Sequence, residues 1–319
     1  MSRIIVDSLR GNSASSDAIS LANDGTCIAK ITNNLSNRNL IINGSHIVWQ
    51  RTTSISGGTL GNFVYATDRF WLYSPSSSSG TVQQSTDVPS GFIYSTHNNL
   101  DAECLIGTNV ELFKVGSDAP FVNGESLTLS FYIKSTSARS NVAIDISTRD
   151  NAGGTGSVTR ATSPTFNTTT NWTRVEKTFT LTGTVGSSNA CLQFQFTLAV
   201  GDKVTGFQLE KNSFATDFEF RSYAQELALA QRYFQKNATA QMYMAVIRTA
   251  DSQHRLNLNL PVTMRATPTG TVTSANQDGG PSLTIESGSS EHTIKIRQGP
   301  AVNTSSAPSV SEYTLDAEF

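Results

Sequence analysis

Several stretches of the chain alternate between hydrophobic and mostly polar residues with a period of two. The alternation is clearest over residues 127–134, 142–147 and 192–198. This pattern is typical of strands that bury one face. Gly, Asn and Asp cluster between the stretches, as in 150–154, and mark turns. Many short strands joined by polar turns predict a jelly-roll-type β-sandwich, which we place at residues 37–222.

A helical pattern interrupts the alternation. Residues 223–235 are rich in Ala, Leu and Gln, which favours a linking helix over that range. Ser222 precedes it as a suitable N-cap. Three apolar residues share one helical face: Leu227, Ala230 and Phe234. Alternation then returns within 236–319 and predicts a smaller C-terminal β-sandwich, so the expected fold is all-β with one linking helix.

The first 36 residues differ from both predicted domains. Their apolar stretches are short, are separated by small polar residues, and cannot build a core of their own. We therefore expect residues 1–36 to form a short N-terminal arm that attaches to a partner chain. Its contacts are expected to be four apolar residues: Ile4, Ile5, Val6 and Leu9.

The small share of charged residues and the low net charge limit the classes of molecule that the chain can bind. Charged residues make up 15% of the chain, and the formal net charge is −2. Typical globular proteins are about 25% charged. Because no basic field is available to neutralise phosphates, we expect no nucleic-acid partner. No apolar run approaches the roughly 18 residues that span a bilayer, so we expect no membrane insertion. No secretory signal is recognisable, which indicates synthesis in a cytoplasm.

Residue types that catalyse reactions or bind metals are scattered. The cysteines and histidines lack CxxC, HxH and HxxxH spacing, so we expect no metal site, disulfide framework or cofactor. A structural calcium, which needs only oxygen ligands in a loop, is left open. The acids considered for a glycan-cutting carboxylate pair are Asp68, Asp101, Glu103, Glu125, Asp145 and Glu210. The sequence cannot place any two of them across a groove at the separation that hydrolysis needs, and we expect no enzymatic activity.

Aromatic residues are frequent in the N-terminal third of the predicted sandwich. The candidate glycan contacts among them are Trp49, Trp71, Tyr73 and Tyr94. An exposed aromatic ring offers an apolar face on which a sugar ring can stack, while neighbouring amides and carboxylates bond to the sugar hydroxyls. The alternative for each aromatic residue is a place in the sandwich core.

Three parts of the chain, taken together and in order, resemble a known class of protein. They are NLIINGSHIVWQR (39–51) with ATDRFW (66–71), GFQLEKNSFATDFEFRS (206–222) with QRYF (231–234), and LPVTMRATP (260–268) with LDAEF (315–319). This order resembles bacteriophage and prophage virion proteins that are described as tail-fibre-like or carbohydrate-binding-module-like. The N-terminal arm is similar to those of marine phages.

The resemblance implies a jelly-roll domain similar to carbohydrate-binding modules, a location in the virion and a homotrimer. It fixes no glycan-binding residues, and its motif residues have scaffold roles. We expect Asp68 and Arg69 to form a buried ion pair at a strand start. Arg221, Arg232 and Tyr233 are expected to tie the helix to the sandwich.

Three functional hypotheses follow. The leading one is a phage appendage protein of the tail-fibre type, which attaches to other virion proteins through residues 1–36 and contacts host surface polysaccharide. The second is a capsid decoration, head-fibre or tail-connector protein without receptor binding. The third, a glycan depolymerase carried on a fibre, has the least support from the sequence.

Overall fold

The computed structural model separates the chain into two compact units, Met1–Arg38 and Asn39–Phe319. The structure describes residues 8–10, 19–21, 27–29, 38–75, 78–112, 121, 123–150, 157–183, 189–237, 242–243, 254–276, 283–286, 289–298 and 309–318. In the first unit, antiparallel strands follow the order β1 (Ser8–Leu9), β2 (Ile19–Leu21) and β3 (Cys27–Ala29). Leu9 is exposed. The other three predicted attachment residues, Ile4, Ile5 and Val6, lie outside the described residues.

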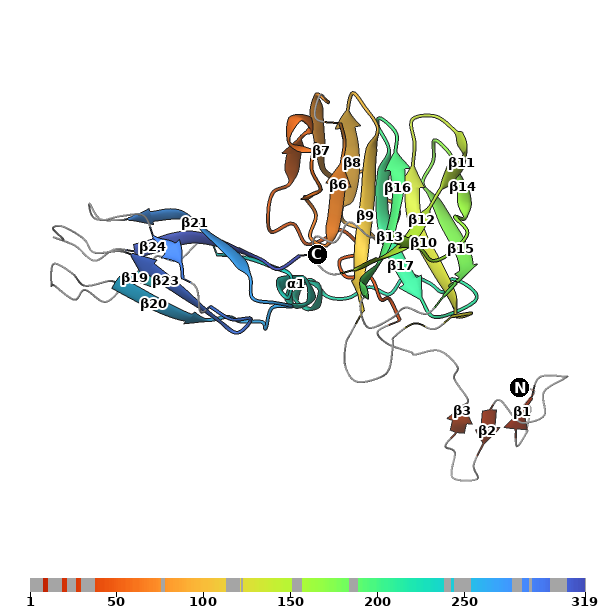
Figure 1. Cartoon of the computed structure of the whole chain (residues 1–319). Coiled ribbons are helices and arrows are strands. Elements are labelled where there is room, and N and C mark those ends of the chain that lie inside the picture. Colours follow the sequence, from red (N-terminus) through yellow and green to blue (C-terminus); the bar gives the residue numbers. More distant parts are fainter. Residues whose placement is uncertain are drawn as a thin grey trace, which may run out of the picture. The chain divides into compact units, whose positions relative to one another are not determined.

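Two six-stranded antiparallel sheets form the first part of the second unit (Figure 1). The β10 sheet has the order β15 (Thr173–Thr180), β10 (Ser126–Lys134), β17 (Lys203–Glu210), β8 (Ser95–Leu100), β7 (Gly80–Ser85) and β4 (Ser54–Ser56). The β9 sheet has the order β13 (Ser157–Thr159), β12 (Asp145–Asp150), β16 (Asn189–Leu198), β9 (Cys104–Glu111), β6 (Phe70–Tyr73) and β5 (Val64–Tyr65). A further pair consists of β11 (Arg139–Ala143) and β14 (Thr165–Thr168), and a short 3-10 helix, η1, spans Gly57–Thr59.

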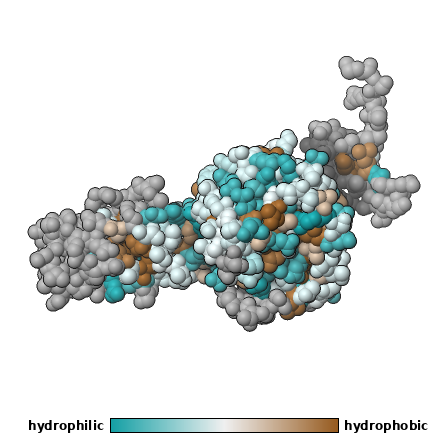
Figure 2. All heavy atoms as spheres, turned by 90° about the horizontal axis from the view of Figure 1, so that it is seen from above, coloured by the Kyte–Doolittle hydropathy of each residue, from teal (hydrophilic) through white to brown (hydrophobic). Residues whose placement is uncertain are grey.

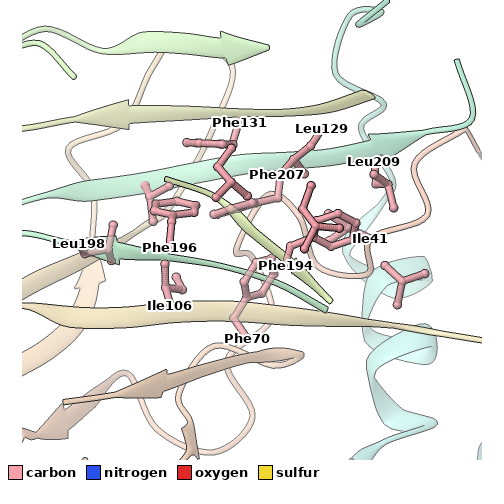
Figure 3. Packing of buried hydrophobic residues seen from close by; sticks show 14 of the residues in the cluster. Ile41, Phe70, Ile106, Leu129, Phe131, Phe194, Phe196, Leu198, Phe207 and Leu209 are labelled. Carbon is pink, nitrogen blue, oxygen red and sulfur yellow. The ribbon is translucent and has the colours of Figure 1, made fainter. Parts of the chain in front are cut away.

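The core lies between these two sheets and follows the alternation in the sequence. The buried hydrophobic side chains of β10 are Leu127, Leu129, Phe131 and Ile133, and those of β16 include Leu192, Phe194, Phe196 and Leu198. At the centre, the Phe131 ring stacks on Phe196 with 4.8 Å between centroids and on Phe207 with 5.3 Å (Figure 3). The predicted all-β, jelly-roll-type sandwich is confirmed.

The helix α1 (Tyr223–Gln231) begins at a capping box. Ser222 Oγ accepts a hydrogen bond from the Gln225 backbone N–H, and the Gln225 side chain accepts one from the Ser222 backbone. The helix ends earlier than predicted, because Phe234 starts β18 (Phe234–Asn237) and pairs with Asp316. Of the predicted apolar face, only Ala230 is a buried residue of the helix itself, and Leu227 is half-buried.

Two smaller antiparallel sheets make up the C-terminal part of this unit. One contains β18, β24 (Ser309–Asp316) and β19 (Met242–Tyr243), with β21 (Thr269–Asn276) also paired to β24. The other has the order β20 (His254–Asn259), β23 (Thr293–Gln298) and β22 (Thr284–Ile285). Both contribute to one buried cluster that includes Ile294, Ile296, Val310 and Leu315. The domain boundaries at 37–222, 223–235 and 236–319 stay predictions.

A buried charge network joins the sandwich to the end of the chain. Asp68 and Arg69 are both buried but do not form the expected ion pair with each other. Asp68 pairs with Arg51 at 3.1 Å, whereas Arg69 pairs with Glu318 and lies 3.5 Å from the centre of the Tyr233 ring. The prediction of an Asp68–Arg69 pair is wrong, because the turn at these residues directs the neighbours to different partners.

The other predicted scaffold residues contact the sandwich from both ends of α1. Arg232 bonds to both carboxylate oxygens of Glu111 at 3.1 Å, and the Tyr233 hydroxyl donates to the same carboxylate at 2.7 Å. Arg221 donates to the backbone carbonyls of Asn39 and Ile41. These contacts hold the helix against the sandwich.

The surface shown in Figure 2 mixes hydrophilic residues with small hydrophobic patches. Among the described residues, none of the helices combines the length and apolar character that crossing a bilayer requires.

Acid is expected to destabilise the sandwich through His46. The ring is buried beside Phe207, and burial lowers the pKa of this histidine to about 3. The unfolded chain takes up a proton near pH 6.5, whereas the folded chain does not. The stability that neutral His46 contributes is therefore present above pH 6.5 and is lost as the pH falls toward 3.

We expect the free energy of unfolding to fall by roughly 2–3 kcal/mol more in the wild type than in His46→Asn between pH 7 and about pH 4.5. Asparagine suits the positive φ of 54° at this position. Burial raises the pKa of Asp68 to about 6, which favours the fold at low pH, but this contribution is common to both proteins and cancels. Urea unfolding across this pH range measures the difference, and parallel pH profiles would contradict the assignment.

Candidate functional site

The side chains of the β9 sheet that point away from the core form regular rows across the strands. In one row, Trp71 of β6 is opposite Gly107 of β9, Gly107 is opposite Gln195 of β16, and Gln195 is opposite Asp145 of β12. Two residues further along β6, Tyr73 lies on the same face, because side chains in a strand alternate between faces. We call this surface the β9 face; its outward residues include Tyr73, Asp145, Arg149, Gln193 and Gln195, with Phe63 packed on Trp71.

Trp71 supports this face from below. A Cβ atom on Gly107 would lie 2.1 Å from the indole ring, so only glycine lets the ring lie against the backbone of β9. Phe63 packs edge to face on Trp71 with 4.9 Å between centroids. Trp71 is consequently 2% exposed. Neither ring face is open for a sugar to stack on, which favours the alternative that Trp71 is a packing residue.

The open aromatic surface is provided by two neighbours of Trp71. Phe63 is 51% exposed and lies 5.4 Å from the half-buried Tyr73 ring, between centroids. The guanidinium of Arg149 lies 5.4 Å from the centre of the Phe63 ring. Together the two rings form an aromatic platform, and the Arg149 guanidinium lies over the Phe63 ring.

Paired polar side chains lie beside this platform. The Gln195 amide donates to Asp145 at 2.8 Å, and Arg149 Nε donates to Gln193 Oε1 at 2.8 Å. Each pair fixes the orientation of its members and leaves further donors or acceptors on the same groups. A ligand with an apolar ring face and many hydroxyls matches such a surface.

Two polar atoms of this face are buried without a hydrogen-bond partner among the described residues. They are the indole N–H of Trp71 and the side-chain oxygen of Asn109. Unpaired buried groups cost about 1–3 kcal/mol each, so a partner that reaches them binds favourably. Both atoms are buried in this conformation, so neither is open to a ligand as the side chains stand.

Trp49 and Tyr94 lie elsewhere, in a groove of about 580 Å³. Phe92, Phe220 and Tyr223 also line it. The four predicted glycan contacts therefore divide into two pairs, and the structure does not bring the pairs together.

The sequence alone did not identify four residues of the β9 face as site residues: Phe63, Gln193, Gln195 and Arg149. The alternation in 192–198 shows that both glutamines point away from the core. It does not show which strands lie beside β16, so nothing in the sequence linked them to an aromatic platform.

Metal-binding residues do not cluster in the part of the chain that the structure describes: no three His, Cys, Asp or Glu side chains come together there. Cys104 and Cys191 are buried free thiols.

Comparison with known proteins gives one family match. Residues 61–202 match the family model described as "Carbohydrate binding domain". No curated protein matches the chain.

Among solved structures, the chain is similar to the CBM22-1 xylan-binding domain of Xyn10C from Paenibacillus barcinonensis, with 11% identity, coverage of 51% of this chain and 94% of that chain, and a TM-score of 0.30. The family 11 carbohydrate-binding module from Clostridium thermocellum shows 15% identity, coverage of 48% and 91%, and a TM-score of 0.29. The enzymatically active domain of tailspike protein 4 from bacteriophage CBA120 shows 16% identity, coverage of 54% of this chain but 21% of that chain, and a TM-score of 0.30.

The segment that matches the family contains the strands of the β9 sheet. All the strands of the β9 sheet, from Val64 of β5 to Leu198 of β16, lie within residues 61–202. The part of the chain that carries the β9 face is thus the part that matches the carbohydrate-binding domain family.

Proposed function

We propose that the chain binds carbohydrate on the β9 face. The observation that carries this proposal is the coincidence of the family match with a surface on which Phe63 and Tyr73 offer aromatic rings beside fixed amide, carboxylate and guanidinium groups. A sugar ring stacks its C–H face on the aromatic platform. Its hydroxyls bond to the Gln195–Asp145 pair and to the guanidinium of Arg149, which the buried Gln193 orients.

Replacing Tyr73 with alanine is expected to raise the dissociation constant for a bound polysaccharide roughly tenfold, which corresponds to about 1.4 kcal/mol. The change removes half of the platform but leaves the sandwich core intact. Titration calorimetry of the full chain against a panel of neutral and acidic polysaccharides provides the measurement.

Phe214→Ala is the matched control, because Phe214 is an exposed aromatic residue that lines neither the β9 face nor the groove. It should bind as the wild type does. Equal affinities for Tyr73→Ala and the control would remove the β9 face as the binding surface.

We further propose that the chain is part of a phage appendage of the tail-fibre type and binds carbohydrate in that role. The support is the resemblance of residues 39–319 to virion proteins and the N-terminal segment 1–36, whose sequence favours attachment to a partner. In this proposal the protein is made in the host cytoplasm, assembles as a homotrimer, attaches to other virion proteins by its arm and contacts host surface polysaccharide.

Cryo-electron microscopy of the particle that carries the chain tests this finer proposal. Density at the tail, with the sandwich directed outward and three copies together, is the expected result. Density flat on the capsid would make the protein a decoration instead.

The proposed role is binding without catalysis. Several of the acids considered for hydrolysis are engaged in the scaffold: Asp68 with Arg51, Asp101 with Ser79, Glu125 with Lys211, and Glu210 with Thr216. Release of reducing ends from a polysaccharide that the chain binds would favour the depolymerase alternative.

A further inference from the structure

We propose that the groove containing Trp49 and Tyr94 is a second site for an uncharged glycan chain, separate from the β9 face. The proposal deepens the proposed function, since it rests on carbohydrate as the ligand class. We call this surface the aromatic groove; its ring-bearing residues are Trp49, Phe92, Tyr94, Phe220 and Tyr223.

The aromatic groove is built largely from residues outside the family match. Its walls come from the segment that holds Ser45, Trp49 and Thr53, from the connection between β7 and β8, and from the residues at the start of α1. Only the β7–β8 part lies within residues 61–202. Since β7 and β8 belong to the β10 sheet, the groove and the β9 face are on different sheets.

A cluster of packed rings holds the base of the groove in place. Phe92 lies 5.0 Å from both Phe218 and Phe220, and 5.3 Å from Tyr132, between centroids. Gly206 permits this packing, because a Cβ there would come within 2.8 Å of the Phe92 and Tyr132 rings. The rings are therefore fixed before any ligand binds, which lowers the entropic cost of binding.

The groove nevertheless exposes apolar surface to solvent. Ile93 is 61% exposed, and Phe220 and Tyr223 are each 56% exposed. Large apolar side chains that gather in one hollow, next to polar groups such as Gln84 and Thr53, indicate a binding site.

The charges of the groove point to an uncharged ligand. The guanidinium of Arg221 is committed to the scaffold, where it bonds to two backbone carbonyls and to Glu226 at 3.4 Å. The remaining polar side chains on the walls carry hydroxyls or an amide: Ser45, Thr53, Tyr94, Tyr223 and Gln84. Aromatic faces with neutral donors and acceptors suit a sugar ring better than a phosphate or a carboxylate.

A second hollow extends the same surface and indicates a chain of several sugars. It measures about 710 Å³, and Tyr223 lines it as well as the aromatic groove. Its amide-bearing residues are Gln50, Gln231, Gln235, Asn237 and Asn259. The lysine in its wall, Lys236, pairs with Glu312 at 3.1 Å. A glycan stacked in the aromatic groove can thus continue past Tyr223 into a hollow lined by neutral amides.

An extended peptide fits this surface less well. A peptide bound as an added strand needs unpaired backbone groups, but β7 and β8 already pair with each other beside the groove, from Ser85 opposite Ser95 onward. A proline-rich peptide can bind without pairing to a strand, so it is one of the ligands tested.

The test uses the full chain in four forms: wild type, Tyr73→Ala, Tyr223→Ala and the double variant. Each is titrated by calorimetry with uncharged disaccharides and longer oligosaccharides, and with a proline-rich peptide. We expect Tyr73→Ala to weaken the β9-face site and to leave the groove site unchanged, and the double variant to bind at the groove roughly tenfold more weakly as well. Longer oligosaccharides should bind this site more tightly than disaccharides.

Leu229→Ala is the matched control, because Leu229 is exposed on the same helix and lines neither hollow. It should leave both sites unchanged. A loss of all binding in Tyr73→Ala, an unchanged remaining site in the double variant, or groove binding of the peptide alone would each overturn the inference. If Tyr223→Ala weakens binding and Tyr73→Ala does not, the groove stands and the proposed β9 face fails.

Discussion

Replacing Arg69 with methionine is expected to lower the free energy of unfolding by about 3–5 kcal/mol. Arg69 is 1% exposed, pairs with the buried Glu318, and packs its guanidinium on the Tyr233 ring. Methionine keeps much of the packing but leaves the Glu318 carboxylate with one ion-pair partner among the described residues, Arg51 at 3.4 Å. The loss is large because a buried charge without its partner is poorly solvated.

Urea unfolding followed by tryptophan fluorescence measures this loss. Arg255→Met provides the control, because Arg255 pairs with Glu286 at the surface and should change stability by no more than about 1 kcal/mol. The double variant Arg69→Met with Glu318→Gln should recover part of the loss, since it removes both charges. A loss below about 1 kcal/mol for Arg69→Met would show that the network does not hold the chain end to the sandwich.

Phe207→Ala is expected to cost about 3–5 kcal/mol of unfolding free energy. The Phe207 ring lies between the two sheets, 4.8 Å from Phe70 and 5.3 Å from Phe131 between centroids (Figure 3). Close-packed neighbours relax only partly after such a truncation, so a cavity remains where the ring was.

Phe214→Ala removes the same side chain from an exposed position, 55% open to solvent, and should change stability by less than about 1 kcal/mol. Denaturant midpoints for the two variants give the comparison. Similar midpoints would mean that the ring stack at the centre of the sandwich contributes little.

The fold was largely predictable because its signals are local. Alternation over 127–134 and 192–198 correctly gives the buried faces of β10 and β16. The end of α1 was not predictable in this way. Phe234 has helical spacing from Leu227, yet it forms β18 because a strand more than 70 residues later pairs with it.

The candidate site depends on contacts between distant parts of the sequence. Trp71, Gly107, Gln195 and Asp145 form one row only because β6, β9, β16 and β12 are neighbours in the sheet. The alternation shows which way each side chain points but not the order of the strands. For the same reason, the sequence could not show that Trp71 is covered by Phe63 or that Trp49 and Tyr94 share a groove with Phe220.

The most direct test of carbohydrate binding on the β9 face is a crystal structure of the full chain with an oligosaccharide that it binds in solution. We expect a sugar ring stacked on Phe63 and Tyr73, with hydroxyls within hydrogen-bond distance of Gln195 and Asp145. A complex in which the sugar occupies other surfaces and leaves these residues uncontacted would contradict the proposed function.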